Sequence, residues 1–348
     1  MHDTSKWGGK ANARASEPLS WYNLAMTSSR LIASGHAPGK IILFGEHAVV
    51  YGRPAIAAPV QQVQAHAEIY PHRRCQIQAA DLGRVIVVAE APDDDPFARI
   101  VRLVCAELER PLPRWRIVVR SEIPIAAGLG SGAAIAAAIA RGMAAAFGEE
   151  LSRERLSALV YEVEKLHHGA PSGIDNTVVA YEQPVWFVRG REPQPFAVGE
   201  SLHLLVADTG VASPTRVTVG AVRRAWEGDP LRYEAMFDAV GAIATAARGA
   251  IAAGDAAALG LLMDENQRLL AAMNVSSPEL ERLIFAARNA GALGAKLSGG
   301  GGGGNMIALA RAAAVERVGQ ALRAAGATRV IRTAIHLPAP RGRRLKSG

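Results

Sequence analysis

The 348-residue chain has only two cysteines, few aromatic residues and no long uninterrupted apolar run. Cys75 and Cys105 are far apart in the sequence, which excludes a disulfide scaffold or a zinc knuckle and fits a reducing cytoplasm. Gly, Pro or charged residues interrupt the apolar stretches before the roughly 18–20 residues that a membrane span needs, and the N-terminus has no apolar signal segment. These absences predict a cytoplasmic protein that does not bind membranes.

Aromatic residues make up 5% of the chain, although its net charge is +7. The basic residues are spread along the sequence and are densest in the last eight residues, 341–348. Because so few rings are available to stack on bases, the positive charge predicts a solvated basic tail and a cationic cleft for a polyanionic substrate. We therefore expect no nucleic-acid partner.

The hydrophobic content of 49% is enough for a sizeable core. Residues 1–30 lack apolar periodicity and predict a flexible leader. Short β-type runs dominate the next part of the chain, whereas helical patterns dominate from about 214 to 290. This pattern predicts an α+β protein with two domains, 31–200 and 201–340. The strands expected are 41–44, 63–69, 85–88, 115–123, 202–207, 306–310 and 329–337, and the helices of the first half are one after Pro96, one at 133–147 and one from Ser152 to about 167.

A glycine-rich turn, PIAAGLGSGAA, runs from Pro124 to Ala134 between a predicted strand and an alanine-rich helix. Glycine lets the backbone approach a ligand, and the free N–H groups of a helix's first turn attract anions. The segment predicts a phosphate cradle, with a simple tight turn as the alternative. It also fits a dinucleotide fingerprint, but Pro124 to Ala127 separate it from the strand. A Walker A loop is absent, because Gly35 to Lys40 is one residue too short.

Charged residues gather in two further segments. APGKIILFGEHAVVYG, residues 37–52, carries Lys40, Glu46 and His47, each of which could alternatively be a solvated side chain. HGAPSGIDN, residues 168–176, carries Ser172 and Asp175 and follows Glu164. One carboxylate can accept or polarise a substrate hydroxyl while a second holds Mg²⁺. The alternative for Ser172 and Asp175 is a role as helix caps; a nucleophilic serine is disfavoured because no G-x-S-x-G elbow surrounds Ser172.

Six consecutive glycines, 299–304, lie between Lys296 and an apolar strand. A flexible linker is one reading of this run. Ordering so many glycines is entropically unfavourable, so stability alone does not explain a glycine run that leads directly into a buried strand. Close approach of the backbone to phosphates or substrate is the better interpretation.

Taken together, these segments resemble the three motifs of the GHMP small-molecule kinases in the right order. They are A-P-G-K…G-E-H-A-V-V-x-G, P-x-x-x-G-L-G-S-x-A-A and K-L-S-G-x-G-G-G-G. The segment H-G-x-P-S-G-I-D-N is similar to that of the mevalonate kinases within this family. The resemblance covers about residues 31–338. It implies an N-terminal domain like ribosomal protein S5 domain 2, a ferredoxin-like C-terminal domain and ATP bound between them.

The resemblance implies an enzyme that moves the γ-phosphate of ATP to the 5-hydroxyl of mevalonate, in the mevalonate route to isoprenoids, and a homodimer. Another GHMP kinase, acting on a different hydroxyl or a related polyol, is the alternative. A catalytically dead paralogue used as a sensor is disfavoured, because Lys40, Glu164 and Asp175 are all present.

The resemblance also implies roles for single residues. Asp175 would polarise the substrate hydroxyl, and Lys40 would pair with it and stabilise the charge of the transferring group. Mg²⁺, the cofactor with ATP, would be held by Ser131 and Glu164. The ATP phosphates would lie over Pro124, Ala127, Gly128, Leu129, Gly130, Ser131, Gly132 and Ala133. Mevalonate would lie near Glu46, His47, Ser172, Gly300 and Gly301. The family usually has a second serine where this chain has Gly132.

Overall fold

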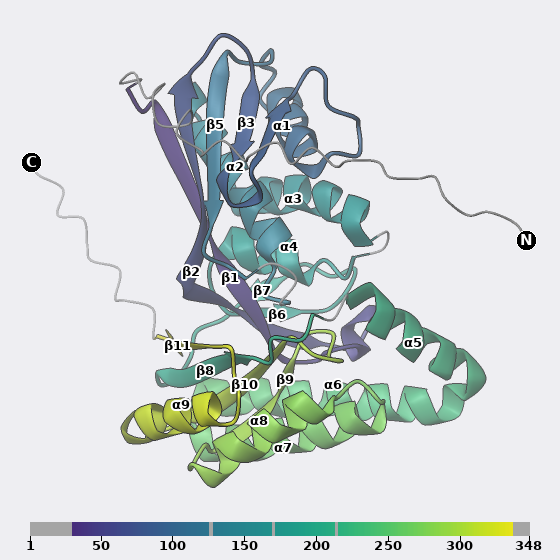
Figure 1. The fold of residues 1–348 in the computed structure, drawn as a ribbon. Coiled ribbons are helices and arrows are strands. Elements are labelled where there is room, and N and C mark those ends of the chain that lie inside the picture. The colour runs from purple at the N-terminus through teal and green to yellow at the C-terminus, as the bar shows by residue number, and fades with distance from the viewer. Residues whose placement is uncertain (1–29, 125–127, 169–170, 213–214, 337–348) are drawn as a thin grey trace, which may run out of the picture. The chain divides into compact units, whose positions relative to one another are not determined.

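The computed structural model describes residues 30–124, 128–168, 171–212 and 215–336. Two β-sheets and nine α-helices form in this part of the chain (Figure 1), which confirms the expected α+β class. The first sheet contains β1 (Ala33–Phe44), β2 (Ala55–Pro71), β3 (Gln76–Ala79), β4 (Arg84–Val87), β5 (Trp115–Ser121), β6 (Val185–Phe187) and β7 (Gln194–Pro195). The second contains β8 (Leu202–Asp208), β9 (Gly294–Ser298), β10 (Asn305–Ala310) and β11 (Arg329–Ile335).

The helices fall into two groups along the chain. Those associated with the first sheet are α1 (Pro96–Glu107), α2 (Ser131–Phe147), α3 (Arg153–His168) and α4 (Ile174–Tyr181). Those that follow β8 are α5 (Thr215–Gly228), α6 (Pro230–Ala253), α7 (Ala256–Ala272), α8 (Pro278–Asn289) and α9 (Val315–Ala324). Short 3₁₀ turns form at Ala48–Tyr51, Ala80–Leu82 and Ala312–Ala314.

In the first sheet the strand order is β4-β3-β5-β2-β6-β7, and β1 pairs with β2. All these pairs are antiparallel except β3 with β5. The predicted alternation in β2 is confirmed, since Val63, Ala65, Ala67 and Ile69 are buried while His66 between them is exposed. One face of this strand therefore packs on the core and the other faces solvent.

Helix α2 packs closely against β1, and two glycines make this possible. A Cβ on Gly35 would lie 2.2 Å from the carbonyl oxygen of Ala138 and 2.3 Å from the backbone nitrogen of Gly142, so no other residue fits there. The buried residues of α2 are mostly alanines, which allow the same close approach. This packing fixes the N-terminus of α2 relative to β1.

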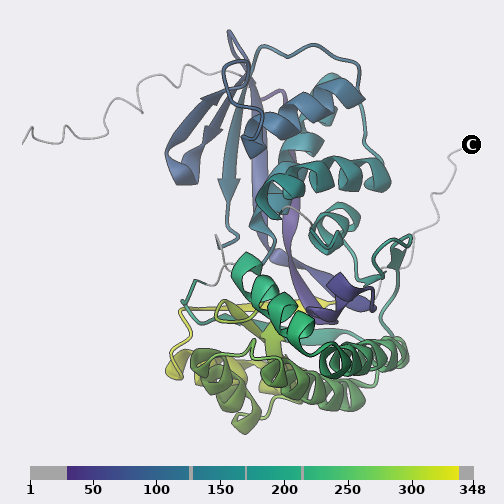
Figure 2. The same cartoon turned by 90° about the vertical axis from the view of Figure 1, so that its right-hand side faces the viewer.

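The second sheet is antiparallel in the order β11-β8-β10-β9, and its strands β9 and β10 are buried along their whole length. Leu204 and Val206 of β8 share a core with the first sheet, whereas Leu205 and Ala207 pack into a second core with the helices. Helices α7 and α8 contact β9, and α9 contacts β8 and β11 (Figures 1 and 2). A strand buried on both faces loses the alternation of apolar and polar residues, which explains the continuous apolar runs of β8 and β10.

Most predicted elements are present, with shifted boundaries. Helix α2 begins at Ser131 rather than 133, and β5 ends at Ser121 rather than 123. Ser152 caps α3 as expected, because its hydroxyl accepts the Arg155 backbone N–H at 3.3 Å. The sequence prediction missed β3, β6, β7, β9 and helix α4, and it missed that β1 begins at Ala33.

In helix α6, as expected for the apolar stretches of this chain, charged residues and glycines such as Asp238, Gly241 and Arg248 interrupt the apolar sequence. Among the described helices α6 alone has the length and composition of a possible span, with a mean hydropathy of 1.3 over 18 residues. It nevertheless buries Tyr233, Phe237, Val240 and Ile243 in the two cores. A buried core helix of this kind passes the same test, so the helix is weak evidence for a membrane.

Candidate active site

An ion pair between Lys40 and Asp175 marks the candidate site. Strand β1 carries Lys40, and the first turn of α4 carries Asp175; Lys40 Nζ lies 2.9 Å from Asp175 Oδ1. The lysine side chain is 5% exposed and the aspartate side chain 27% exposed. A carboxylate in a helix's first turn is favoured by the helix dipole. The pair thus holds one carboxylate oxygen while leaving Asp175 accessible from one side.

The glycine-rich turn lies directly against Lys40. The backbone N–H of Lys40 donates to the carbonyl oxygen of Leu129 at 2.9 Å. Gly130 has a left-handed φ of 72°, and a Cβ there would lie 2.8 Å from Cγ of Lys40 and 3.7 Å from Oδ2 of Asp175. Glycine is therefore required at this position both by conformation and by space.

Helix α2 begins immediately after this turn and directs its N-terminus towards the ion pair. Leu129 is buried and anchors the turn, Ser131 is half-buried, and Gly132 is exposed. The N–H groups of 131–133 precede the first hydrogen bond of the helix, which runs from Ala134 N to Gly130 O. These free donors and the dipole of a 17-residue helix form an anion site. Of the other predicted phosphate contacts, Pro124 and Ala133 are described and Ala127 lies outside the described residues.

Glu164 on α3 is the second carboxylate of the site. Its side chain is buried, and its pKa is raised to about 7: burial raises it most, the negative charge of Asp175 also raises it, and the positive charge of Lys40 lowers it. Helices α3 and α4, which carry Glu164 and Asp175, pack against each other. A carboxylate and a serine hydroxyl are oxygen ligands of the kind that Mg²⁺ prefers, and Mg²⁺ needs only one or two carboxylates besides substrate phosphates. Glu164 and Ser131 therefore fit a Mg²⁺ ion, although no cluster of three or more acidic, His or Cys side chains suits a metal among the described residues.

His47 lies beside the glycine run. Its Nε2 atom is 3.0 Å from the carbonyl oxygen of Gly300, and burial lowers its pKa to about 4. The ring is therefore neutral near pH 7, and because a carbonyl only accepts, Nε2 carries the proton. Nδ1 is left as a hydrogen-bond acceptor. Its backbone φ of 60° is unusual for a non-glycine residue and typical of functional sites.

Glu46 is placed differently from its neighbour. Its carboxylate is fully buried, forms an ion pair with Lys296 and accepts a hydrogen bond from Asn266 Nδ2 at 3.3 Å. Burial raises the pKa of Glu46 and lowers that of Lys296. The sequence analysis did not assign a role to Lys296. The one available signal was a lysine within an otherwise apolar strand, since buried lysines are almost always paired.

Ser172 and the glycine run are held by backbone hydrogen bonds. The Ser172 hydroxyl accepts the Ile174 N–H at 3.3 Å, but the N-cap of α4 is Gly173, so Ser172 precedes the cap position. Gly302 N donates to Val275 O at 2.7 Å, and a Cβ on Gly301 would lie 2.0 Å from that same oxygen. The glycine run is thus an ordered connection between β9 and β10 rather than a linker.

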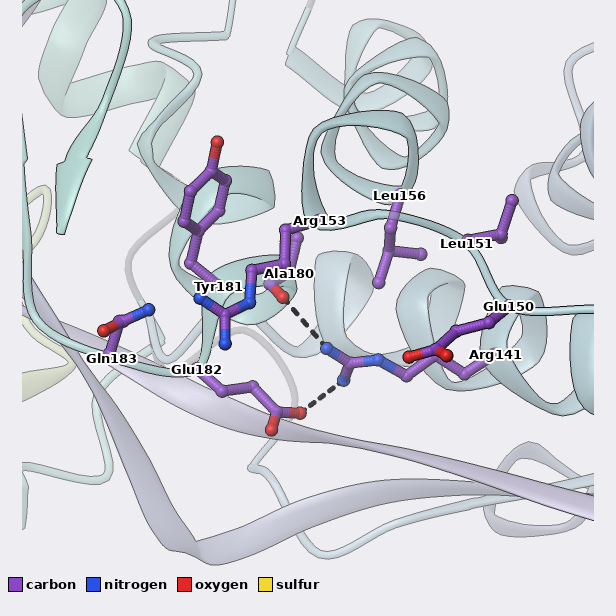
Figure 3. A pocket seen from close by; sticks show the side chains of 9 residues that line it. All are labelled: Arg141, Glu150, Leu151, Arg153, Leu156, Ala180, Tyr181, Glu182 and Gln183. Atoms are coloured by element: carbon purple, nitrogen blue, oxygen red, sulfur yellow. Dashed lines mark hydrogen bonds and ion pairs between the residues drawn. The ribbon is translucent and has the colours of Figure 1, made fainter. Parts of the chain in front are cut away.

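A pocket of about 360 Å³ lies elsewhere, at the C-terminal end of α4 (Figure 3). Arg141 in its wall pairs with Glu182 and donates to the carbonyl oxygen of Ala180 at 3.0 Å. None of the predicted site residues lines this pocket. From α4 it is lined by Ala180 and Tyr181 at the end of the helix, whereas Asp175 lies in the first turn. The pocket is therefore separate from the candidate site.

Comparison with known proteins defines the class. The N-terminal domain of GHMP kinases matches residues 96–183, and the C-terminal domain of GHMP kinases matches residues 247–328. The first match includes the anion site of α2, and the second includes strands β9 and β10 with helices α7, α8 and α9. The fold is therefore that of a GHMP kinase, as expected from the sequence.

Individual relatives narrow this class. The mevalonate kinase of Pyrococcus furiosus is 37% identical over 324 residues, covering 87% of this chain and 95% of the relative. That of Aeropyrum pernix is 37% identical over 299 residues, covering 83% and 91%. The crystal structure of L. major mevalonate kinase in complex with R-mevalonate is 29% identical, with a TM-score of 0.75 over 90% of this chain and 100% of that one. The chain belongs to the mevalonate kinase family of the GHMP kinases.

Proposed function

We propose that this enzyme transfers the γ-phosphoryl group of ATP to the 5-hydroxyl of mevalonate, giving 5-phosphomevalonate and ADP on the route to isoprenoids. The observation that carries the proposal is the Lys40–Asp175 ion pair beside the N-terminus of α2. It brings together a group that can take a hydroxyl proton, a cation and an anion site, which are the parts that phosphoryl transfer needs. The family relationship supplies the substrate.

Asp175 acts on the nucleophile. Its side chain is exposed enough to meet a substrate hydroxyl, while Oδ1 is fixed by Lys40. A carboxylate fixed in this way accepts a hydrogen bond from the primary hydroxyl and takes its proton as the O–P bond forms. The ammonium group of Lys40 stabilises negative charge on the transferring phosphoryl oxygens, and this requires no rearrangement because the ion pair holds it in place.

The phosphates of ATP occupy the turn from Pro124 to Ala133 and accept hydrogen bonds from the free N–H groups of α2. Ser131 and Glu164 would hold Mg²⁺, which neutralises phosphate charge when bound. On the substrate side, Nδ1 of His47 accepts a hydrogen bond from mevalonate, and Gly300 and Gly301 form a backbone wall. The hydroxyl of Ser172 can donate its proton in a hydrogen bond to mevalonate. Glu46 is buried next to His47 in the chain and supports its position.

Several coarser properties belong to the same proposal. We propose that the protein is a cytoplasmic homodimer with no nucleic-acid or membrane partner. We also propose domains at 31–200 and 201–340; the first sheet ends at Pro195 and the second begins at Leu202, which supports a boundary between them. Light scattering after gel filtration tests the dimer, since a monomer mass would contradict it.

The substrate is tested by ADP release with mevalonate, phosphomevalonate, galactose and homoserine. We expect mevalonate to be turned over most efficiently. Phosphorus NMR of the product then identifies the hydroxyl, because a phosphate on the primary carbon couples to two protons and a phosphate on the tertiary carbon couples to none. An uncoupled signal, or a preference for another alcohol, would contradict the proposal.

A further inference from the structure

Two side chains connect the end of β1 to β9 and to the glycine run. The Ser298 hydroxyl accepts from Ile42 N at 3.0 Å and donates to Ile42 O at 3.0 Å, so it replaces a missing strand partner for that residue. Nε2 of His47 donates to Gly300 O at 3.0 Å. Both contacts join segments that lie about 250 residues apart in the sequence. One segment is β1 of the first sheet and the loop after it, and the other is β9 of the second sheet and the glycine run after it.

Lys296 supplies a third connection between the same segments. Its ammonium group pairs with Glu46 and donates to the carbonyl oxygen of Leu297 at 2.6 Å, and its side chain is 0% exposed. We call residues 42–47 and 296–300, joined by these three connections, the β1–β9 seam. Both segments of the seam are continuous with the candidate site. Residues 42–47 follow Lys40 in the chain, and residues 296–300 lead into the glycine run.

The seam also touches the phosphate-binding turn. A Cβ on Gly128 would lie 4.0 Å from the carbonyl oxygen of Ser298, and one on Gly299 would lie 3.8 Å from the carbonyl oxygen of Gly128. Gly300 faces the first turn of α5, because a Cβ there would lie 3.2 Å from Cα of Thr215. A shift along the seam therefore changes where the glycine run lies relative to both the turn and α5.

We propose that Lys296 is a positioning residue: by holding Glu46 it keeps His47 and the glycine run in register with Lys40, without touching the substrate. This role rests on the proposed function of the site. Lys296 is enclosed, and its partners Glu46 and Leu297 are both internal, so it acts through Glu46. His47 follows Glu46 directly and has a φ of 60°, a conformation that persists only where its surroundings fix it.

A buried ion pair suits this task better than apolar side chains of the same size. Apolar groups pack in many arrangements, whereas a lysine and a glutamate enclosed together tolerate only the register in which they meet. Asn266 on α7 donates to the same carboxylate, and Gln267 beside it accepts the Leu297 N–H at 2.9 Å. Helix α7 thus fixes both members of the seam at once.

The test compares Lys296→Met with Arg288→Met. Arg288 on α8 also contacts β9, because its Nη2 donates to Ala295 O at 2.8 Å. Its Nε donates to Asp264 at 2.8 Å, and neither partner belongs to residues 42–47. Both variants remove a cation that supports the same strand. Hydrogen exchange of the free protein is measured over 299–304, where Gly302 and Gly304 donate to Val275 and Val211.

We expect exchange over 299–304 to be about tenfold faster in Lys296→Met and within about twofold of the parent in Arg288→Met, since local opening governs exchange. In the kinase assay Lys296→Met should raise the KM for mevalonate by about tenfold, with less than about threefold change in the KM for ATP, because small misplacements of substrate-positioning groups have large effects. Unchanged exchange and unchanged KM in folded Lys296→Met would overturn the proposal.

Ser298→Ala covers the case in which Lys296→Met does not fold. It removes one hydroxyl from the seam, and we expect smaller changes in the same direction, about threefold in exchange and in the KM for mevalonate. If neither quantity changes, the seam does not position the site. Exchange is measured without substrate, so it decides the role of Lys296 even if the parent fails to phosphorylate mevalonate, an outcome that would sink only the proposed function.

Discussion

Two lysine–carboxylate pairs lie at opposite ends of the segment from residue 40 to residue 47, and they differ mainly in enclosure. In the Lys40–Asp175 pair the carboxylate is 27% exposed, whereas both side chains of the Lys296–Glu46 pair are 0% exposed. The carboxylate of Asp175 can bind a substrate hydroxyl during the reaction because one side of it is exposed. Glu46 cannot, since Lys296 and Asn266 already occupy it.

The comparison shows that residue type alone does not separate a chemical role from a positioning role. Both carboxylates belong to sequence motifs shared with the family, and both have a lysine partner. What separates them is whether solvent and ligand reach the carboxylate. Breaking the pair with the partly exposed carboxylate should change chemistry more than folding, whereas breaking the fully buried pair leaves an uncompensated charge in the core.

Asp175→Asn should have the largest effect on turnover. We expect kcat to fall by about 10²-fold or more, the scale of a lost acid–base group, while ATP affinity stays near that of the parent. Lys40→Met should be comparably damaging, and the double variant should be no worse than either single one if the pair acts as a unit. Steady-state kinetics decide this. Turnover within about threefold of the parent would remove Asp175 from its role.

Glu46→Gln should instead affect folding. The change leaves Lys296 as an unpaired buried cation, and we expect the free energy of unfolding to fall by about 3–5 kcal/mol. The double variant Glu46→Gln/Lys296→Met removes both charges and should recover most of this loss. Urea denaturation measures both, with Asp175→Asn as the comparison that should lose less, because the carboxylate of that pair is 27% exposed. Equal losses for Glu46→Gln and Asp175→Asn would abolish the distinction between the two pairs.

His47 should make stability depend on pH. Its pKa is lowered from 6.5 to about 4 by burial, so between these values the unfolded chain binds a proton that the folded chain does not. The free energy of unfolding is therefore unaffected by protonation of His47 above pH 6.5. It decreases as the pH falls from 6.5 towards 4, by up to about 3 kcal/mol. His47→Asn, which tolerates a positive φ, should remove that part of the decline. Urea denaturation at pH 7 and pH 4.5 measures it; an unchanged decline in the variant would contradict the prediction.

Much of the fold was predictable from periodicity. The alternation of β2, the helix after Pro96 and the alanine-rich α2 follow from local patterns and are present. Strand β1 was recognised only at its apolar end, because Gly35, Pro38 and Gly39 are rare in strands. The structure explains these exceptions: Gly35 allows α2 to approach, and the register with β2 shifts between Pro38 and Gly39.

The candidate site was predictable in its residues but not in all their contacts. Lys40, Asp175 and the glycine-rich turn were each recognised from local sequence, and the structure brings them together. The partner of Glu46 was not recognised, because Lys296 is 250 residues away and its short strand β9, Gly-Ala-Lys-Leu-Ser, resembles a turn. Which charged side chains become enclosed depends on how the two sheets meet, and local sequence does not contain that information.

The smallest expected effect concerns Gly132, where the family usually has a second serine. Gly132 is exposed in the first turn of α2, and it is absent from the glycines with positive φ, so the backbone accepts a side chain there. Gly132→Ser should therefore stay active. Its hydroxyl lies next to Ser131 in the chain and could replace one water of Mg²⁺, lowering the Mg²⁺ concentration for half-maximal rate by about twofold. Any β-carbon also favours the helix by a few tenths of a kcal/mol.

Gly132→Ala separates these two effects, because it adds the β-carbon without the hydroxyl. Both variants should melt slightly above the parent, the alanine variant at least as high as the serine variant. Only Gly132→Ser should need less Mg²⁺ when rate is titrated against free Mg²⁺ at fixed ATP. If the two variants have the same Mg²⁺ requirement, the added hydroxyl does not reach the metal. Ser131 would then be the only residue of this turn whose hydroxyl binds Mg²⁺.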